Sequence, residues 1–250
     1  VQIDALGAWL GAISYCLQLY FDFSGYSDMA LGLGLLFGVR LPENFNYPYT
    51  AGSVTEFWRR WHISLSHWFR DYLYIPLGGS RKGTARTVLN KLAVFLATGL
   101  WHGTGLSFVF WGLWHGLFCS LETVFDRKKT LSRHWYGHIY TLLVVIFGFV
   151  LFRAESLPQA GVMLRAMLTG FAPIDACRLM IRNLLTARVV FFLLAGMAED
   201  SRKARRKAGS GTSAGRRYGS GVHRLRGAAG VQFVPAVYLR RLLEVRYEKP

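Results

Sequence analysis

The chain has 250 residues, of which 52% are apolar and 18% are charged, and its formal net charge is +16. Soluble domains carry about 25% charged residues, so this composition, with its charges gathered in short segments, is typical of a polytopic membrane protein. The last fifth, residues 201–250, holds 13 Lys or Arg and 2 Asp or Glu. Because the basic excess lies there without a nucleic-acid recognition motif, the charge does not indicate a nucleic-acid-binding protein.

The first apolar segments are residues 5–21 and residues 29–39. The first contains no charged residue, and we expect it to span a membrane. Asp22 and Asp28 separate it from the second segment, which is rich in glycine and short for a full crossing. We therefore expect a re-entrant or closely packed helix over residues 29–39, followed by a loop at residues 42–48 that contains two prolines.

Residues 53–76 have the pattern of one amphipathic helix, with tryptophans on one face and arginines on the other. We expect Ser53 or Thr55 to cap its start. Such a helix suits the headgroup level of a membrane. Three arginines on its polar face would contact lipid phosphate or, as the alternative, hold an anionic acyl donor: Arg59, Arg60 and Arg70.

His62 lies in this segment, at the border between the aromatic and the polar face. It is either a group aimed at a polar tunnel or an ordinary interfacial histidine. Ser64 and Ser66 lie near His62 and leave a serine nucleophile open, an alternative that is weaker because no Gly-x-Ser-x-Gly elbow accompanies them. His67 lies on the charged face, where we expect solvent. A zinc site made of His62, His67 and Asp71 would be a poor motif on a membrane-surface helix, so we expect no metal.

Residues 92–118 run without Asp, Glu, Lys or Arg but contain His102 and His115. Their length and composition predict a transmembrane helix, and ionisable groups in such a helix are functional candidates. His102 would lie near the middle of the membrane. On one continuous helix the two histidines point to different faces, so we expect His102 to be functional and His115 to be structural or interfacial.

The remaining segments alternate between basic and apolar character. We expect a basic loop at residues 126–133, a span at residues 135–152 and a weaker apolar segment at residues 184–197. Residues 198–250 are basic and rich in Gly and Ser, and we expect disorder. Their composition resembles that of a product translated in a shifted frame. Because residue 1 is Val and not Met, we expect the sequence to start inside a longer protein. Residues 1–197 would then form a partial transmembrane domain. A frame of the coding DNA that restores apolar sequence would support this hypothesis.

The sequence resembles the membrane-bound O-acyltransferase family, and within it the bacterial alginate O-acetyltransferase branch, on three stretches: YFDFSGYSDMALGLGLLFGVRLPENFNYPY (20–49), SVTEFWRRWHISLSHWFRDYLYIPLGG (53–79) and GLWHGTGLSFVFWGLWHG (99–116). Together they cover most of residues 20–120. The D-alanyl transfer proteins of lipoteichoic acid synthesis are similar at a greater distance. The resemblance implies an all-α polytopic fold, a ring of transmembrane helices around a thinned centre where a tunnel joins the two faces.

The resemblance also implies a site and a reaction. The Trp-His-Gly histidine of the family, its proposed catalytic residue, corresponds to His102, and the Arg-Trp-His histidine corresponds to His62. The implied reaction transfers an acyl group, acetyl in this branch, from a cytoplasmic thioester such as acetyl-CoA toward an extracytoplasmic polysaccharide hydroxyl. Periplasmic acetyltransferases would be partners, and the location would be the bacterial inner membrane. No tightly bound cofactor is implied.

A histidine suits this chemistry, because its ordinary pKa of about 6.5 lets it accept a proton near neutral pH. The oxyanion would need donors from Trp or Arg side chains or from backbone amides. Three alternatives remain open: a D-alanyl-transferring enzyme of the same family, a transporter or channel in which the histidines relay protons, and a scaffold that docks periplasmic enzymes. Loss of acetylation on replacing His102 would favour the enzyme.

Overall fold

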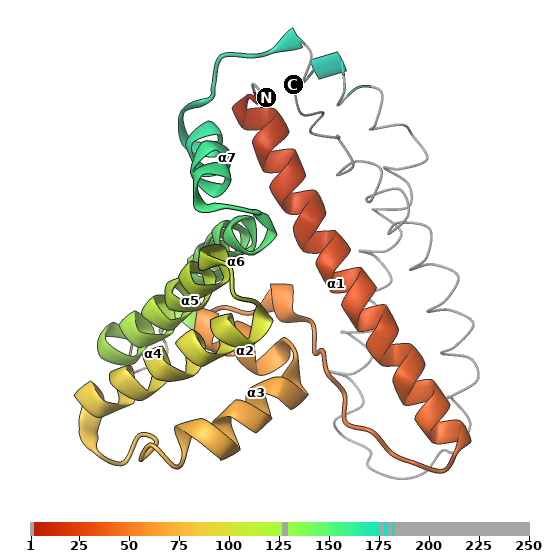
Figure 1. Cartoon of the computed structure of the whole chain (residues 1–250), viewed down its shortest axis with the longest axis vertical. Helices are drawn as coiled ribbons and strands as arrows, with labels where there is room; N and C mark the ends of the chain where they lie inside the picture. The colour runs from red at the N-terminus through yellow and green to blue at the C-terminus, as the bar shows by residue number, and fades with distance from the viewer. Residues whose placement is uncertain (1–2, 127–129, 176–177, 180–181, 183–250) are drawn as a thin grey trace. The chain divides into compact units, whose positions relative to one another are not determined.

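The computed structural model describes residues 3–126, 130–175, 178–179 and 182, and this part of the chain contains helices and no strand (Figure 1). It divides into two compact units, Val1–Glu43 with Thr169–Pro250, and Asn44–Leu168. The apolar segment predicted at residues 184–197 and the disorder predicted for residues 198–250 lie outside the described residues.

The first unit contains one long helix, α1 (Ala5–Leu36, red in Figure 1). Asp4 caps its start, with Oδ1 accepting a hydrogen bond from the backbone N–H of Gly7 at 2.8 Å. The prediction of two separate segments divided at Asp22 and Asp28 is wrong, because both residues lie inside this helix. An aspartate in a helix interior costs well under 1 kcal/mol relative to alanine, which is too little to end a helix of 32 residues.

The second unit begins with short helices and continues with longer ones. In chain order these are η1 (Pro48–Thr50), α2 (Val54–Arg60), α3 (Ile63–Phe69), a π-helical turn η2 (Arg70–Tyr74), α4 (Gly83–His102), α5 (Leu106–Phe125), η3 (Leu131–Arg133), α6 (Trp135–Arg153) and α7 (Leu157–Thr169). In Figure 1, α4, α5 and α6 lie next to one another, and the helix contacts agree.

The amphipathic segment is two helices rather than one, which corrects the prediction for residues 53–76. Ser53 caps α2 as expected, its Oγ accepting from the backbone N–H of Glu56 at 3.1 Å. The helix ends at Arg60, Trp61 is extended, and His62 takes a left-handed conformation with φ 44° and ψ 57° before α3 begins. A left-handed residue cannot continue a right-handed helix, so the direction of the chain changes at His62.

The charge-free stretch at residues 92–118 also breaks, which corrects the prediction of one continuous helix. α4 ends at His102 and α5 begins at Leu106, with two glycines in the connection. The two helices form an antiparallel hairpin with very close backbones. A Cβ on Gly99 would lie 2.5 Å from the carbonyl oxygen of Phe108, and one on Gly112 would lie 2.3 Å from that of Phe95.

Two helices of the described chain are long and apolar enough to cross a membrane: α5 and α6. The predicted span at residues 135–152 is therefore confirmed as α6. The span predicted at residues 5–21 is not, since α1 is not one of the two. Between α2, α5 and α6 lies a core of buried side chains that includes Val54, Cys119 and Val144.

Candidate active site

His62 is held in its left-handed conformation by hydrogen bonds on both sides. The backbone oxygen of Asn44 accepts from Ile63 N at 3.0 Å, and its side-chain Oδ1 accepts from Ser64 N at 3.0 Å and Ser64 Oγ at 2.7 Å. Ser66 Oγ donates to the Trp58 carbonyl at 3.0 Å, across the break. A left-handed residue other than glycine costs about 1–2 kcal/mol, and these bonds offset that cost while fixing where the His62 side chain starts.

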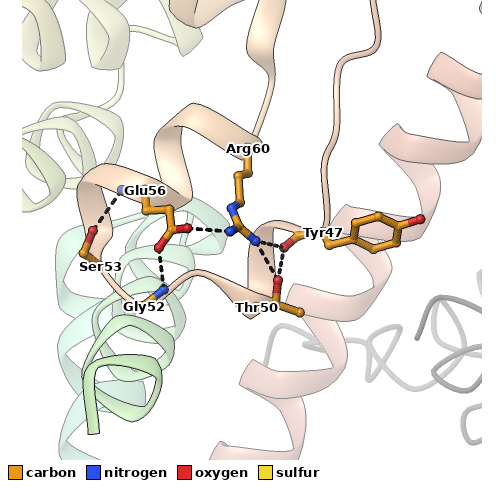
Figure 2. Close-up of polar contacts among 6 residues, drawn as sticks. All are labelled: Tyr47, Thr50, Gly52, Ser53, Glu56 and Arg60. Carbon is orange, nitrogen blue, oxygen red and sulfur yellow. Dashed lines mark hydrogen bonds and ion pairs between the residues drawn. The ribbon is translucent and has the colours of Figure 1, made fainter. Parts of the chain in front are cut away.

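A second set of contacts fixes α2, which leads into His62 (Figure 2). The Glu56 carboxylate accepts from Gly52 N at 2.9 Å and pairs with the guanidinium of Arg60 one turn later. Arg60 also donates to Thr50 Oγ1 at 2.7 Å and to the Tyr47 carbonyl at 3.4 Å. Glu56 and Arg60 therefore bind both ends of α2 to the preceding loop.

Glu122 anchors the start of α2, a role that sequence reasoning missed. Its side chain is buried on α5, and its two oxygens accept from Val54 N at 2.6 Å and Thr55 N at 2.8 Å. These are two of the free N–H groups at a helix start, where a negative charge is favourable. The sequence signal that could have revealed this role is an acidic residue at the end of an apolar segment. Its partners could not be predicted, because they lie about 70 positions earlier in the chain.

His102 is the last residue of α4, next to the turn into α5, and does not lie inside one continuous helix as predicted. It is half-buried, and its ring packs edge-on against Trp111 and Phe152 with centroids 5.0 and 5.3 Å apart. Burial, followed by an electrostatic interaction with His102, lowers the pKa of His62 from 6.5 to about 4. The two predicted site histidines therefore lie within electrostatic reach, and the His62 imidazole is neutral at pH 7.

His115 lies much nearer to His102 than predicted. The turn after α4 brings Trp111 against both histidines, with centroids 5.0 Å from His102 and 5.6 Å from His115. The prediction that the two histidines point to different faces assumed one continuous helix. The glycine-rich turn between α4 and α5 shows that this assumption was wrong. His115 is fully buried, which agrees with the structural role among the two alternatives predicted for it.

The three arginines predicted as alternatives for binding an anionic donor, Arg59, Arg60 and Arg70, differ in their surroundings. Arg60 is bound into the network around Glu56, and Arg70 pairs with Asp71 on the surface, with Nε to Oδ1 at 2.7 Å. Arg59 is exposed. His67 is exposed on α3, as expected from its place on the charged face. Among the described residues, no group of three or more His, Cys, Asp or Glu is arranged to hold a metal ion.

The fold and the site define a helical membrane protein in which two half-buried histidines, His62 and His102, each lie at a break between helices. Residues 2–158 match the model of the membrane-bound O-acyltransferase family, so the chain belongs to that family, which confirms the resemblance.

Three curated relatives show where this chain falls within the family. The probable alginate O-acetylase AlgI of Pseudomonas fluorescens is 52% identical over 161 residues, covering 64% of this chain and 32% of that protein. The peptidoglycan O-acetyltransferase of Helicobacter pylori is 44% identical over 182 residues, covering 71% of this chain and 34% of that protein. The teichoic acid D-alanyltransferase of Bacillus subtilis is 33% identical over 168 residues, covering 60% of this chain and 42% of that protein. The chain spans about a third of the length of the first of these relatives.

Proposed function

We propose that this chain belongs to the catalytic part of a membrane-embedded O-acyltransferase that transfers an acetyl group from a cytoplasmic thioester to an extracytoplasmic polysaccharide hydroxyl. The observation that supports this best is that His62 and His102 are both half-buried, each at a break between helices of the same unit, and interact electrostatically. The relatives named for O-acetyl transfer are more similar to the chain than the D-alanyltransferase is, which favours acetyl over D-alanyl.

In this mechanism His102 is the general base. Its imidazole accepts the proton of the acceptor hydroxyl while the hydroxyl oxygen bonds to the thioester carbonyl carbon. The tetrahedral intermediate then collapses, the carbon–sulfur bond breaks, and the proton passes from His102 to the departing thiolate. His62 is a neutral second imidazole beside it, which orients the reacting group without competing for the proton. The bacterial inner membrane and periplasmic acetyltransferase partners complete the proposal.

The test uses a full-length chimera, in which residues 2–158 of this chain replace the matching segment of the Pseudomonas fluorescens relative. We expect membranes that contain the chimera to incorporate labelled acetyl from acetyl-CoA into polysaccharide. His102→Ala should lower that rate at least about 100-fold, the usual contribution of a general base. His67→Ala, an exposed histidine on α3, is the matched control.

Three results would count against the proposal. A chimera that reaches the membrane at the normal level but transfers no acetyl group would remove this segment from the catalytic part. Retained transfer by His102→Ala would make the histidine structural, as a docking scaffold requires. A flux that depends on a pH gradient, without acetyl transfer, would favour the transporter.

A further inference from the structure

Beside His102 lies a buried group of polar atoms that the fold leaves unused. The indole Nε1 atoms of Trp58 and Trp111 and both ring nitrogens of His115 are inaccessible to solvent and have no hydrogen-bond partner among the described residues. Leaving one such group unsatisfied costs about 1–3 kcal/mol. Four of them in one place therefore call for a specific reason.

The three side chains contact one another. The ring centroids of Trp58 and His115 are 5.0 Å apart, those of Trp58 and Trp111 are 5.6 Å apart, and those of Trp111 and His115 are 5.6 Å apart. α2 contributes the first ring and α5 the other two. Gly148 of α6 closes the group on another side, because a Cβ there would lie 2.4 Å from His115 Nε2. The three rings that carry the four polar atoms therefore form one compact cluster, the indole cluster (Trp58, Trp111 and His115).

A tryptophan on the same helix shows that an indole in this core can be satisfied. Trp114 Nε1 donates to the carbonyl of Val144 on α6 at 2.9 Å. Trp58 and Trp111 lie in the same unit, among the same helices, and have no such acceptor in the described chain. Their N–H groups are thus available to an acceptor that the described chain does not supply.

The chemistry of the indole cluster limits what it can bind. An indole N–H only donates, and a neutral imidazole offers one donor and one acceptor. The complementary group is therefore an oxygen with lone pairs, and a developing negative charge on it would be stabilised further. Trp111 is buried directly against His102, the half-buried general base of the proposed mechanism. An oxygen that accepts from Trp111 would be bound to a ring that contacts the proton acceptor.

We infer that the indole cluster binds the carbonyl oxygen of the acyl group, with Trp58 and Trp111 as the N–H donors. When the acceptor hydroxyl bonds to the carbonyl carbon, the electron pair moves onto this oxygen, and it returns when the carbon–sulfur bond breaks. Donors placed where the charge develops lower the barrier without strengthening ground-state binding. This inference rests on the proposed function, and it supplies donors that the sequence alone left unnamed.

The test compares three Trp→Phe variants in the chimera. Trp111→Phe and Trp58→Phe each remove one N–H while keeping an aromatic ring. Losing one oxyanion donor lowers kcat about 100–1000-fold, and we expect that loss for both variants with KM for acetyl-CoA changed less than about threefold. Trp114→Phe is the matched control, because it makes the same change of ring at an indole that already has a partner. It should keep kcat within about threefold.

The outcomes separate this inference from the proposed function. Thermal unfolding in detergent identifies variants that fail to fold, and Trp58→Phe serves as the second variant because its ring is only half-buried. Normal kcat in folded Trp111→Phe and Trp58→Phe, together with an inactive His102→Ala, would overturn the indole cluster alone. Equal losses in all three Trp variants would show a packing effect and would also overturn it. Activity that survives His102→Ala would overturn the proposed function itself.

Discussion

Replacing Gly112 with alanine tests whether direct backbone contact holds α4 against α5. The new Cβ would lie 2.3 Å from the carbonyl oxygen of Phe95, whereas real contacts under 3.0 Å essentially never occur. Because that oxygen belongs to helix backbone, the two helices must separate. Overpacking of this kind costs about 1–3 kcal/mol, against the roughly 1 kcal/mol by which alanine is favoured over glycine in a helix. We therefore expect Gly112→Ala to lower the Tm in detergent.

The same substitution at Gly161 is the matched control. This glycine lies in α7, and a Cβ there would meet no atom within 4 Å. Gly161→Ala should keep or raise the Tm, because helix propensity is then the only change. Separating α4 from α5 also moves His102 away from Trp111, so Gly112→Ala should lower acetyl transfer in the chimera. Equal Tm values for the two variants would refute the close-packing explanation.

Three further predictions concern His62 and the residues that position it. Asn44→Ala removes the acceptor at the start of α3, so we expect the free energy of unfolding, followed by thermal unfolding in detergent, to fall by about 1–2 kcal/mol, as for a lost helix cap. Glu122→Gln replaces one of the two oxygens at the start of α2 by a donor, and should cost about 1.5–3 kcal/mol, as for a hydrogen bond to a charged group. Because burial lowers the pKa of His62 from 6.5 to about 4, unfolding takes up a proton between these values. The wild-type protein should therefore lose stability relative to His62→Gln as the pH falls from 6.5 to 4, and Tm measured across that range checks this.

Each of these has its own control. Asn46→Ala changes an exposed side chain and should leave the Tm unchanged, so a similar loss there would remove the special role of Asn44. Glu155→Gln is the exposed counterpart of Glu122→Gln, and the argument fails if both variants unfold at the same temperature. For His62, the difference in Tm from His62→Gln should be constant above pH 7, and a constant difference down to pH 4 would contradict a lowered pKa.

The local sequence was sufficient for features that depend on neighbouring residues. The cap at Ser53, the span of α6 and the exposure of His67 follow from side-chain pattern within one or two helical turns. The family was also predictable, because its motifs are contiguous, and the match over residues 2–158 confirms it.

The breaks at His62 and after His102 could not be read from the same patterns. The amphipathic pattern continues past His62 and the charge-free stretch continues past His102, so a continuous helix was predicted at each, although Gly103 and Gly105 were a turn signal at the second. What decides otherwise lies far along the chain: Asn44 supplies hydrogen bonds around His62, and Phe95 and Gly112 bring α4 and α5 into contact. Only these tertiary contacts outweigh the local preference for helix.

The sequence by itself determined that the chain is helical, apolar and a member of an acyltransferase family, because composition and contiguous motifs need no partner. The tertiary structure decided what surrounds its histidines. It turned one expected helix into a hairpin, packed Trp111 against both His102 and His115, and brought His62 within electrostatic reach of His102. These relations depend on long-range packing and on a turn that reverses the chain, for which Gly103 and Gly105 were the only local signal.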